Sequence, residues 1–144
     1  MSKSYRTIYQ LARNYASLTR EVAAEHLNVS PRSLADYESG KTIPNEDIVE
    51  DMMKVYRTSW LGYEHLRTSS SLGMEVLPGI DFSDVAKSVL VLQKESSDVE
   101  GVKDCMIDIA CDNKIENHEK LRWSQVTKEV RELAGAALSL VFSK

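Results

Sequence analysis

Residues that interrupt helices are scarce in this sequence. Only three prolines and six glycines occur among 144 residues, and long stretches contain neither. Alternation of polar and apolar residues, the pattern of a half-buried strand, is not sustained over any length. Because glycine and proline are the residues that helices tolerate least, their scarcity favours a helical protein. The expected fold class is therefore all-α.

Long hydrophobic runs and paired cysteines are also missing. The most apolar stretch, 133–142, has about half of the roughly 20 residues that a membrane-spanning helix needs. The first part of the chain, up to Tyr15, is polar and does not contain the apolar segment of a secretory signal. Cys105 and Cys111 are six residues apart, which on a helix places them on different faces. These features predict a cytoplasmic protein without a disulfide framework.

The patterns of familiar enzyme and metal sites do not occur. No histidine belongs to a zinc-ligand spacing; the three are His26, His65 and His118. The segment 112–117 has the polar character of a calcium loop, but Lys114 stands at a ligand position and Asn117 replaces the glycine of the turn. Gly-rich phosphate loops, nucleophile elbows and paired catalytic carboxylates are also missing. We therefore expect a protein that is not an enzyme and uses no metal or cofactor.

The charge of the chain is unevenly distributed. The formal net charge is −4, which by itself argues mildly against a nucleic-acid-binding protein. Residues 1–41 nevertheless carry six cations against four anions, a net charge of +2, so the remainder carries −6. The six cations are Lys3, Arg6, Arg13, Arg20, Arg32 and Lys41. The N-terminal part is therefore the part expected to approach DNA.

Apolar periodicity and capping residues predict five helices in the first half of the chain. The N-caps are Thr19, Ser30 and Asn45, and Gly40 suits a helix C-terminus. The expected helices span 5–16, 20–27, 31–39, 46–58 and 61–66.

Three further helices are expected in the second half, at 81–95, 98–111 and 117–142. A run of four small hydroxylated residues, 68–71, marks the boundary between the halves. The predicted organisation is a five-helix domain at 1–68, a linker at 69–80 and a three-helix bundle at 81–144.

The most informative segment is 18–44. It reads LTREVAAEHLNVSPRSLADYESGKTIP, a helix, a three-residue turn and a second helix, with Asn28 where the turn needs a left-handed residue. The segment resembles the helix-turn-helix of the lambda-repressor-like, or XRE, family, whose members typically read LTQEELAEKLGVSRSTISRYESGKRxP. The string from Tyr37 to Lys41, followed by Pro44, is the most specific part. The resemblance covers residues 5–66.

This resemblance implies that the second helix of the pair enters the major groove of double-stranded DNA. The side chains expected to contact bases are Pro31, Arg32, Ser33 and Asp36. The side chains expected to contact phosphates are Arg13, Arg20, Ser30 and Lys41. An arginine suits guanine and a carboxylate suits the N4 amine of cytosine, whereas phosphate contacts carry no sequence information.

Two residues depart from the family pattern. Arg20 stands where the family commonly has Gln, so a phosphate contact is expected to replace the side-chain bridge between the helices. Asp36 brings an anion into a groove lined by phosphates, and either a cytosine or Arg32, four residues earlier, is expected to partner it. Leu34 and Tyr37 are expected in the core.

The last expected helix carries an apolar stripe with spacings of three and four residues. The stripe consists of Val126, Val130, Leu133, Ala134, Ala137, Leu138 and Val141. It can close a monomeric three-helix bundle, or it can join two copies of the chain. We favour a homodimer, because a two-fold dimer matches a palindromic operator, with another protein as the alternative partner of these helices.

The sequence thus predicts a DNA-binding transcriptional regulator, a repressor, that acts through residues 20–39. The alternative is a protein-interaction module of the same fold, such as an antitoxin or a phage accessory protein, with little DNA binding.

Overall fold

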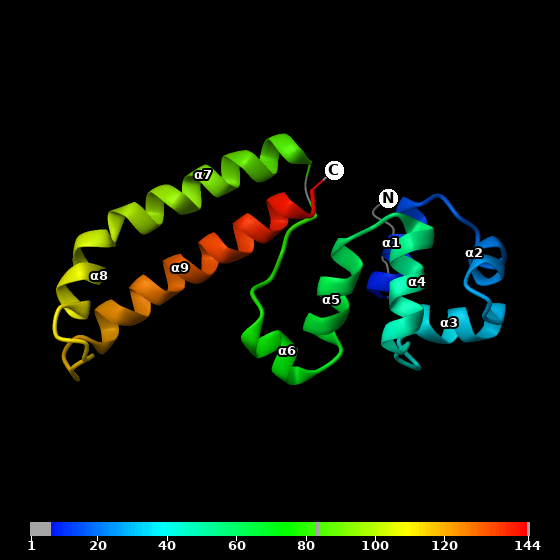
Figure 1. Ribbon diagram of the computed structural model, residues 1–144, viewed down its shortest axis with the longest axis horizontal. Helices are drawn as coiled ribbons and strands as arrows, with labels where there is room; N and C mark the ends of the chain where they lie inside the picture. The colour runs from blue at the N-terminus through cyan, green and yellow to red at the C-terminus, as the bar shows by residue number, and fades with distance from the viewer. Residues whose placement is uncertain (1–6, 83, 144) are drawn as a thin grey trace. The chain divides into compact units, whose positions relative to one another are not determined.

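The computed structural model describes residues 7–82 and 84–143. Over these residues the chain forms nine helices and no strand, which confirms the all-α fold class. The chain divides into two compact units, Met1–Val76 and Leu77–Lys144 (Figure 1). No helix in the described ranges is both long enough and apolar enough to span a membrane.

Six helices make up the described part of the N-terminal unit. They are α1 (Ile8–Tyr15), α2 (Arg20–His26), α3 (Pro31–Ser39), α4 (Glu46–Tyr56), α5 (Trp60–Thr68) and α6 (Ser71–Val76). The first five match the helices expected from the sequence, except that Tyr5 and Arg6, in the expected first helix, lie outside the described residues. The sixth lies within 69–80, the segment expected to be a linker. There the Ser70 hydroxyl accepts a hydrogen bond from the Gly73 amide at 3.0 Å, so a serine of the expected linker caps a helix.

Local capping explains where three of these helices begin. The side chains of Thr19, Ser30 and Asn45 accept hydrogen bonds from the backbone amides three residues later, at 3.0–3.3 Å. Each bond satisfies an amide that has no partner within its helix. Gly40 ends α3 with φ of 76°, a left-handed conformation that glycine adopts without steric cost.

The core of this unit draws one fully buried side chain from each of the first five helices. These side chains are Ala12, Ala23, Leu34, Met52 and Leu61. Tyr37, which was expected in the core, is only half-buried, and Tyr15 at the end of α1 is 60% exposed. Tyr9 is buried in the first helix, where its hydroxyl lies 2.8 Å from Nδ1 of His65. Hydrogen bonding thus allows a tyrosine into the core that apolar periodicity alone does not select.

The C-terminal unit is built on two long helices. It contains α7 (Val85–Gly101), α8 (Lys103–Ala110) and α9 (Lys120–Val141), and α7 runs beside α9 along most of its length (Figure 1). The break expected at residues 96–97 is wrong, because α7 continues through the two serines and ends at Gly101. Three helices are present as expected.

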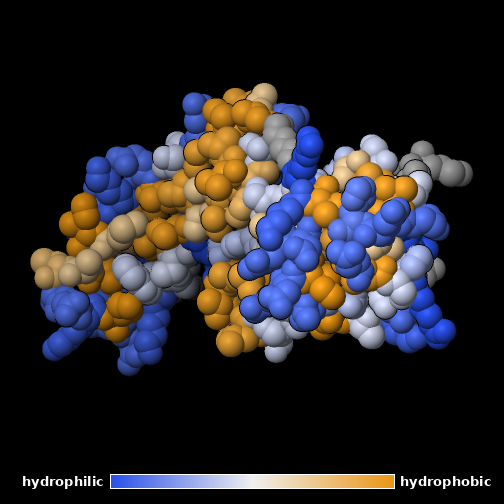
Figure 2. Space-filling view, turned by 45° about the vertical axis from the view of Figure 1, so that its right-hand side comes forward, coloured by the Kyte–Doolittle hydropathy of each residue, from blue (hydrophilic) through white to orange (hydrophobic). Residues whose placement is uncertain are grey.

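The interior of this unit is thin. Among its described residues the buried apolar side chains are Ile109, Val126 and Ala136, and the buried polar ones are Ser88, Glu129 and Ser139. Large apolar side chains stay on the surface, where they gather over α7 and α9 (Figure 2). The most exposed of them are Leu90, Leu121 and Val141.

Candidate nucleic-acid interface

Helices α2 and α3 pack against each other through a short turn. Asn28 occupies the turn with φ of 52°, the left-handed conformation expected for this residue. The Val29 amide donates to the Ala24 carbonyl at 3.1 Å and pulls the chain back toward α2. Leu34 of α3 and Ala23 of α2 are both fully buried, which fixes the two helices as one rigid pair.

Helix α3 is held at both ends. Ser30 caps its first turn, and Pro31 occupies the first helical position, where the missing amide proton costs nothing. At the other end, Gly40 turns the chain so that the Lys41 amide donates to the Asp36 carbonyl at 3.0 Å. The helix is therefore ordered by the protein's own hydrogen bonds.

The four residues expected to contact bases differ in their availability. Pro31 and Arg32 are exposed, whereas Ser33 and Asp36 are half-buried. Arg32 makes no hydrogen bond or ion pair with any described residue. The Ser33 hydroxyl lies 2.9 Å from the Ser30 hydroxyl. An exposed and unengaged guanidinium at the start of α3 is thus the main polar group that this helix offers.

Asp36 has a partner, but not the intrahelical one considered from the sequence. Its carboxylate lies 3.5 Å from Nζ of Lys41, whose side chain is 64% exposed. The pairing follows from Gly40, because the left-handed turn brings Lys41 back over the last turn of α3. This arrangement leaves Arg32 without a partner among the described residues.

The four residues expected to contact phosphates also fall into two groups. Ser30 and Lys41 are exposed on the surface that carries the start and the end of α3. Arg13 is buried, at 7% exposure, and Arg20 is half-buried. The Arg13 guanidinium is used inside the domain, where Nη1 donates to the Leu18 carbonyl at 2.7 Å.

Glu38 is the residue that the sequence reasoning missed. It is 2% exposed, and its carboxylate accepts hydrogen bonds from both Arg13 and Arg20. The hydrogen bond from Arg13 to Glu38 raises the pKa of the Arg13 guanidinium, which therefore stays charged. The bridge between α2 and α3 is therefore an ion pair of Arg20 with Glu38. The available signal was the glutamate within the Tyr-Glu-Ser-Gly-Lys string, which stands on the inner side of α3.

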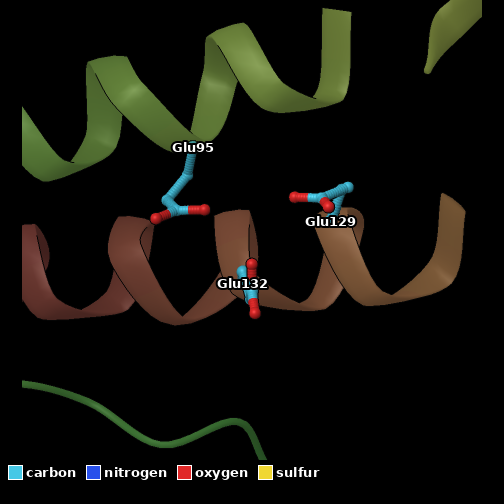
Figure 3. A group of neighbouring side chains, drawn as sticks. All are labelled: Glu95, Glu129 and Glu132. Carbon is cyan, nitrogen blue, oxygen red and sulfur yellow. The ribbon is translucent and has the colours of Figure 1, made fainter. Parts of the chain in front are cut away.

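A group of acidic side chains lies in the C-terminal unit. Glu95 of α7 and Glu129 of α9 face each other between the two helices, with Glu132 nearby on α9 (Figure 3). One carboxylate oxygen from each glutamate lies within 4.8 Å of those from the other two, a spacing that suits a metal ion. Lys94 pairs with Glu95, and Lys128 pairs with both other glutamates. The lysines thus neutralise part of the charge that would attract a cation.

Comparison with known proteins identifies a domain in the first half of the chain. Residues 10–62 match the model of a family described as helix-turn-helix domain. No curated protein and no solved structure matches the chain significantly. The matched range includes α2, the turn after it and α3, and it ends within α5. A domain of this kind indicates, at a coarse level, a DNA-binding regulator. The N-terminal unit therefore contains a helix-turn-helix domain, consistent with the lambda-repressor-like, or XRE, resemblance of its sequence.

Proposed function

We propose that the protein binds double-stranded DNA sequence-specifically and regulates transcription, as a repressor, through residues 20–39. The observation that carries this proposal is the state of Arg32. It lies in the first turn of a helix that is capped at both ends, it is exposed, and no described residue engages it. Side chains at the start of a recognition helix are those that reach base edges.

Arg32 is the base-reading residue in this proposal. An α-helix fits the major groove, and an arginine there can donate two hydrogen bonds to O6 and N7 of a guanine. Pro31, next to Arg32 in the sequence, offers an apolar surface to the bases. Asp36 serves mainly to hold Lys41, whose exposed ammonium contacts a phosphate together with Ser30. Arg13 belongs to the scaffold, because its guanidinium is enclosed by the domain.

The test is a fluorescence-anisotropy titration of the full chain against duplex DNA enriched from a random pool. Arg32→Ala is expected to lose about 1–3 kcal/mol of binding free energy and to relax the preference at one base pair. The matched control is Lys54→Ala, which removes an exposed charge of the same sign from α4. If Arg32→Ala and Lys54→Ala behave alike, Arg32 does not read a base.

Salt dependence separates DNA binding from the alternative role in protein interaction. A DNA-binding protein loses affinity steeply as the salt concentration rises, because each contact with a phosphate releases cations bound to the DNA. If the wild-type chain binds no duplex above a weak background that disappears with salt, the helix-turn-helix serves as a scaffold for a protein partner.

We further propose that the C-terminal unit joins two copies of the chain. Support comes from its thin interior and from the large apolar side chains exposed on α7 and α9, among them Leu90 and Val141. A two-helix pair of this kind completes a bundle when a second pair covers it. Sedimentation equilibrium should give twice the chain mass, and Leu90→Glu should shift the protein toward monomer. A monomeric wild type at high concentration would refute the homodimer and favour another protein as the partner.

A further inference from the structure

The carboxylate of Glu38 is shared by two arginines from different helices. Arg13 of α1 donates from Nε to Oε1 and from Nη2 to Oε2, the latter at 3.1 Å. Arg20 of α2 donates from Nε to Oε2 at 3.1 Å, and its Nη2 lies 3.0 Å from the same oxygen. Both oxygens are thus occupied, and three helices meet at one buried anion.

This cluster carries one more positive charge than negative, and the surplus lies on Arg20. The side chain of Arg20 is 39% exposed, whereas that of Arg13 is 9% exposed. Nε and Nη2 of Arg20 point to Glu38, and Nη1 donates to no described residue. The guanidinium borders a polar hollow of about 440 Å³ that Gln10, Ala35 and Ser39 also line. One edge of the Arg20 guanidinium is therefore fixed, and the other edge is free.

We propose that Glu38 is a positioning residue for DNA binding, which holds Arg20 so that its free edge donates to a DNA phosphate. The proposal rests on the DNA-binding function proposed above. Glu38 itself touches no DNA, since it is 2% exposed and enclosed by the two arginines.

Fixing the guanidinium in advance has a physical advantage. A free arginine on the surface loses rotamer entropy when it grips a phosphate, whereas an arginine already held by a carboxylate loses little. Only a planar group with several donors can bind the carboxylate on one edge and the phosphate on the other. A lysine at position 20 would keep the charge but would lose this geometry.

The test uses DNA affinity and its salt dependence for Arg20→Ala, Arg20→Lys, Glu38→Gln and the double variant Arg20→Ala with Glu38→Gln. Arg20→Ala should weaken binding roughly tenfold and reduce the slope of log K against log salt by about 0.9, the value for one phosphate. Arg20→Lys should keep the wild-type slope and still lose several-fold in affinity. Glu38→Gln should weaken binding in the wild-type background and have no further effect in the Arg20→Ala background. Arg32→Ala is the control, and its loss should add to that of Glu38→Gln.

Titrations are made at a temperature where circular dichroism shows each variant to be folded. If Glu38→Gln does not fold, the proposal is tested with the Arg20 variants and with the exchange rate of the Arg20 Nε–H resonance in the free wild type. A fixed guanidinium gives a slowly exchanging resonance, whereas rapid exchange would overturn the proposal.

The outcomes distinguish this proposal from the function on which it rests. Wild-type affinity for Arg20→Lys, or additive losses for Arg20 and Glu38, would overturn the positioning role while DNA binding stands. A wild-type chain that binds no duplex would overturn both.

Discussion

Replacing Arg13 with alanine should destabilise the N-terminal unit far more than any surface change. Arg13 is 7% exposed and makes hydrogen bonds to both oxygens of Glu38 and to the Leu18 carbonyl. Its removal leaves a buried carboxylate with Arg20 as its remaining counterion, and Arg20 lies at the edge of the cluster.

The size of the effect follows from burial. Removing one partner of a buried ion pair costs about 3–5 kcal/mol, because the charge left behind has lost its hydration. The Leu18 carbonyl also loses its side-chain donor, which costs up to about 1 kcal/mol. By contrast, Lys54→Ala breaks an ion pair with Asp51 in which both side chains are more than half exposed. Such pairs contribute about 0–1 kcal/mol.

Urea unfolding followed by tryptophan fluorescence measures this difference. Trp60 lies in the N-terminal unit at 4% exposure, so a Trp123→Phe background leaves one reporter for that unit. The double variant Arg13→Met with Glu38→Leu should regain most of the stability that Arg13→Ala loses, because it removes both buried charges. A loss below about 1 kcal/mol for Arg13→Ala would refute the reasoning, since the pair would then act like an exposed one.

Two further predictions concern a histidine and two glycines. Burial lowers the pKa of His65, so the folded state binds fewer protons than the unfolded state. The free energy of unfolding therefore falls as the pH drops below about 6.5, the ordinary pKa of histidine. His65→Gln should remove this dependence in urea titrations at several pH values. A methyl group on Gly135 would lie 2.7 Å from the Gly79 carbonyl oxygen, so Gly135→Ala should lower the melting temperature. The added methyl of Gly101→Ala meets no neighbouring atom within 4 Å, so this change should raise the free energy of unfolding by up to about 1 kcal/mol. Equal effects of the two substitutions would contradict the close contact of Gly135 with Gly79.

The helices of the N-terminal unit were predictable because their ends are set by neighbouring residues. Thr19, Ser30 and Asn45 each bond to an amide three positions later, and such bonds depend on local sequence alone. The same holds for Gly40. The sixth helix escaped prediction because a serine in a polar run can serve either as a flexible residue or as a cap, and Ser70 is a cap.

The candidate site was only partly predictable, because its internal bonds join distant residues. Glu38 reaches Arg13 and Arg20, which lie 25 and 18 positions away in the sequence. Composition suggested that both arginines were surface cations, and nothing in their local sequence distinguishes a buried arginine from an exposed one. Arg32 and Lys41 are both near enough in the sequence to pair with Asp36, and the turn at Gly40 brings Lys41 to it.

The caps at both ends of α3 affect the thermodynamics and the rate of association with a ligand. Because Ser30 and Gly40 order the helix in the free protein, no folding step is needed when a ligand docks against its first turn. The heat-capacity change of such an association should then reflect only the area covered, without the additional term that coupled folding contributes. The association rate should likewise be limited by encounter and orientation, and specificity should be expressed mainly in the lifetime of the complex.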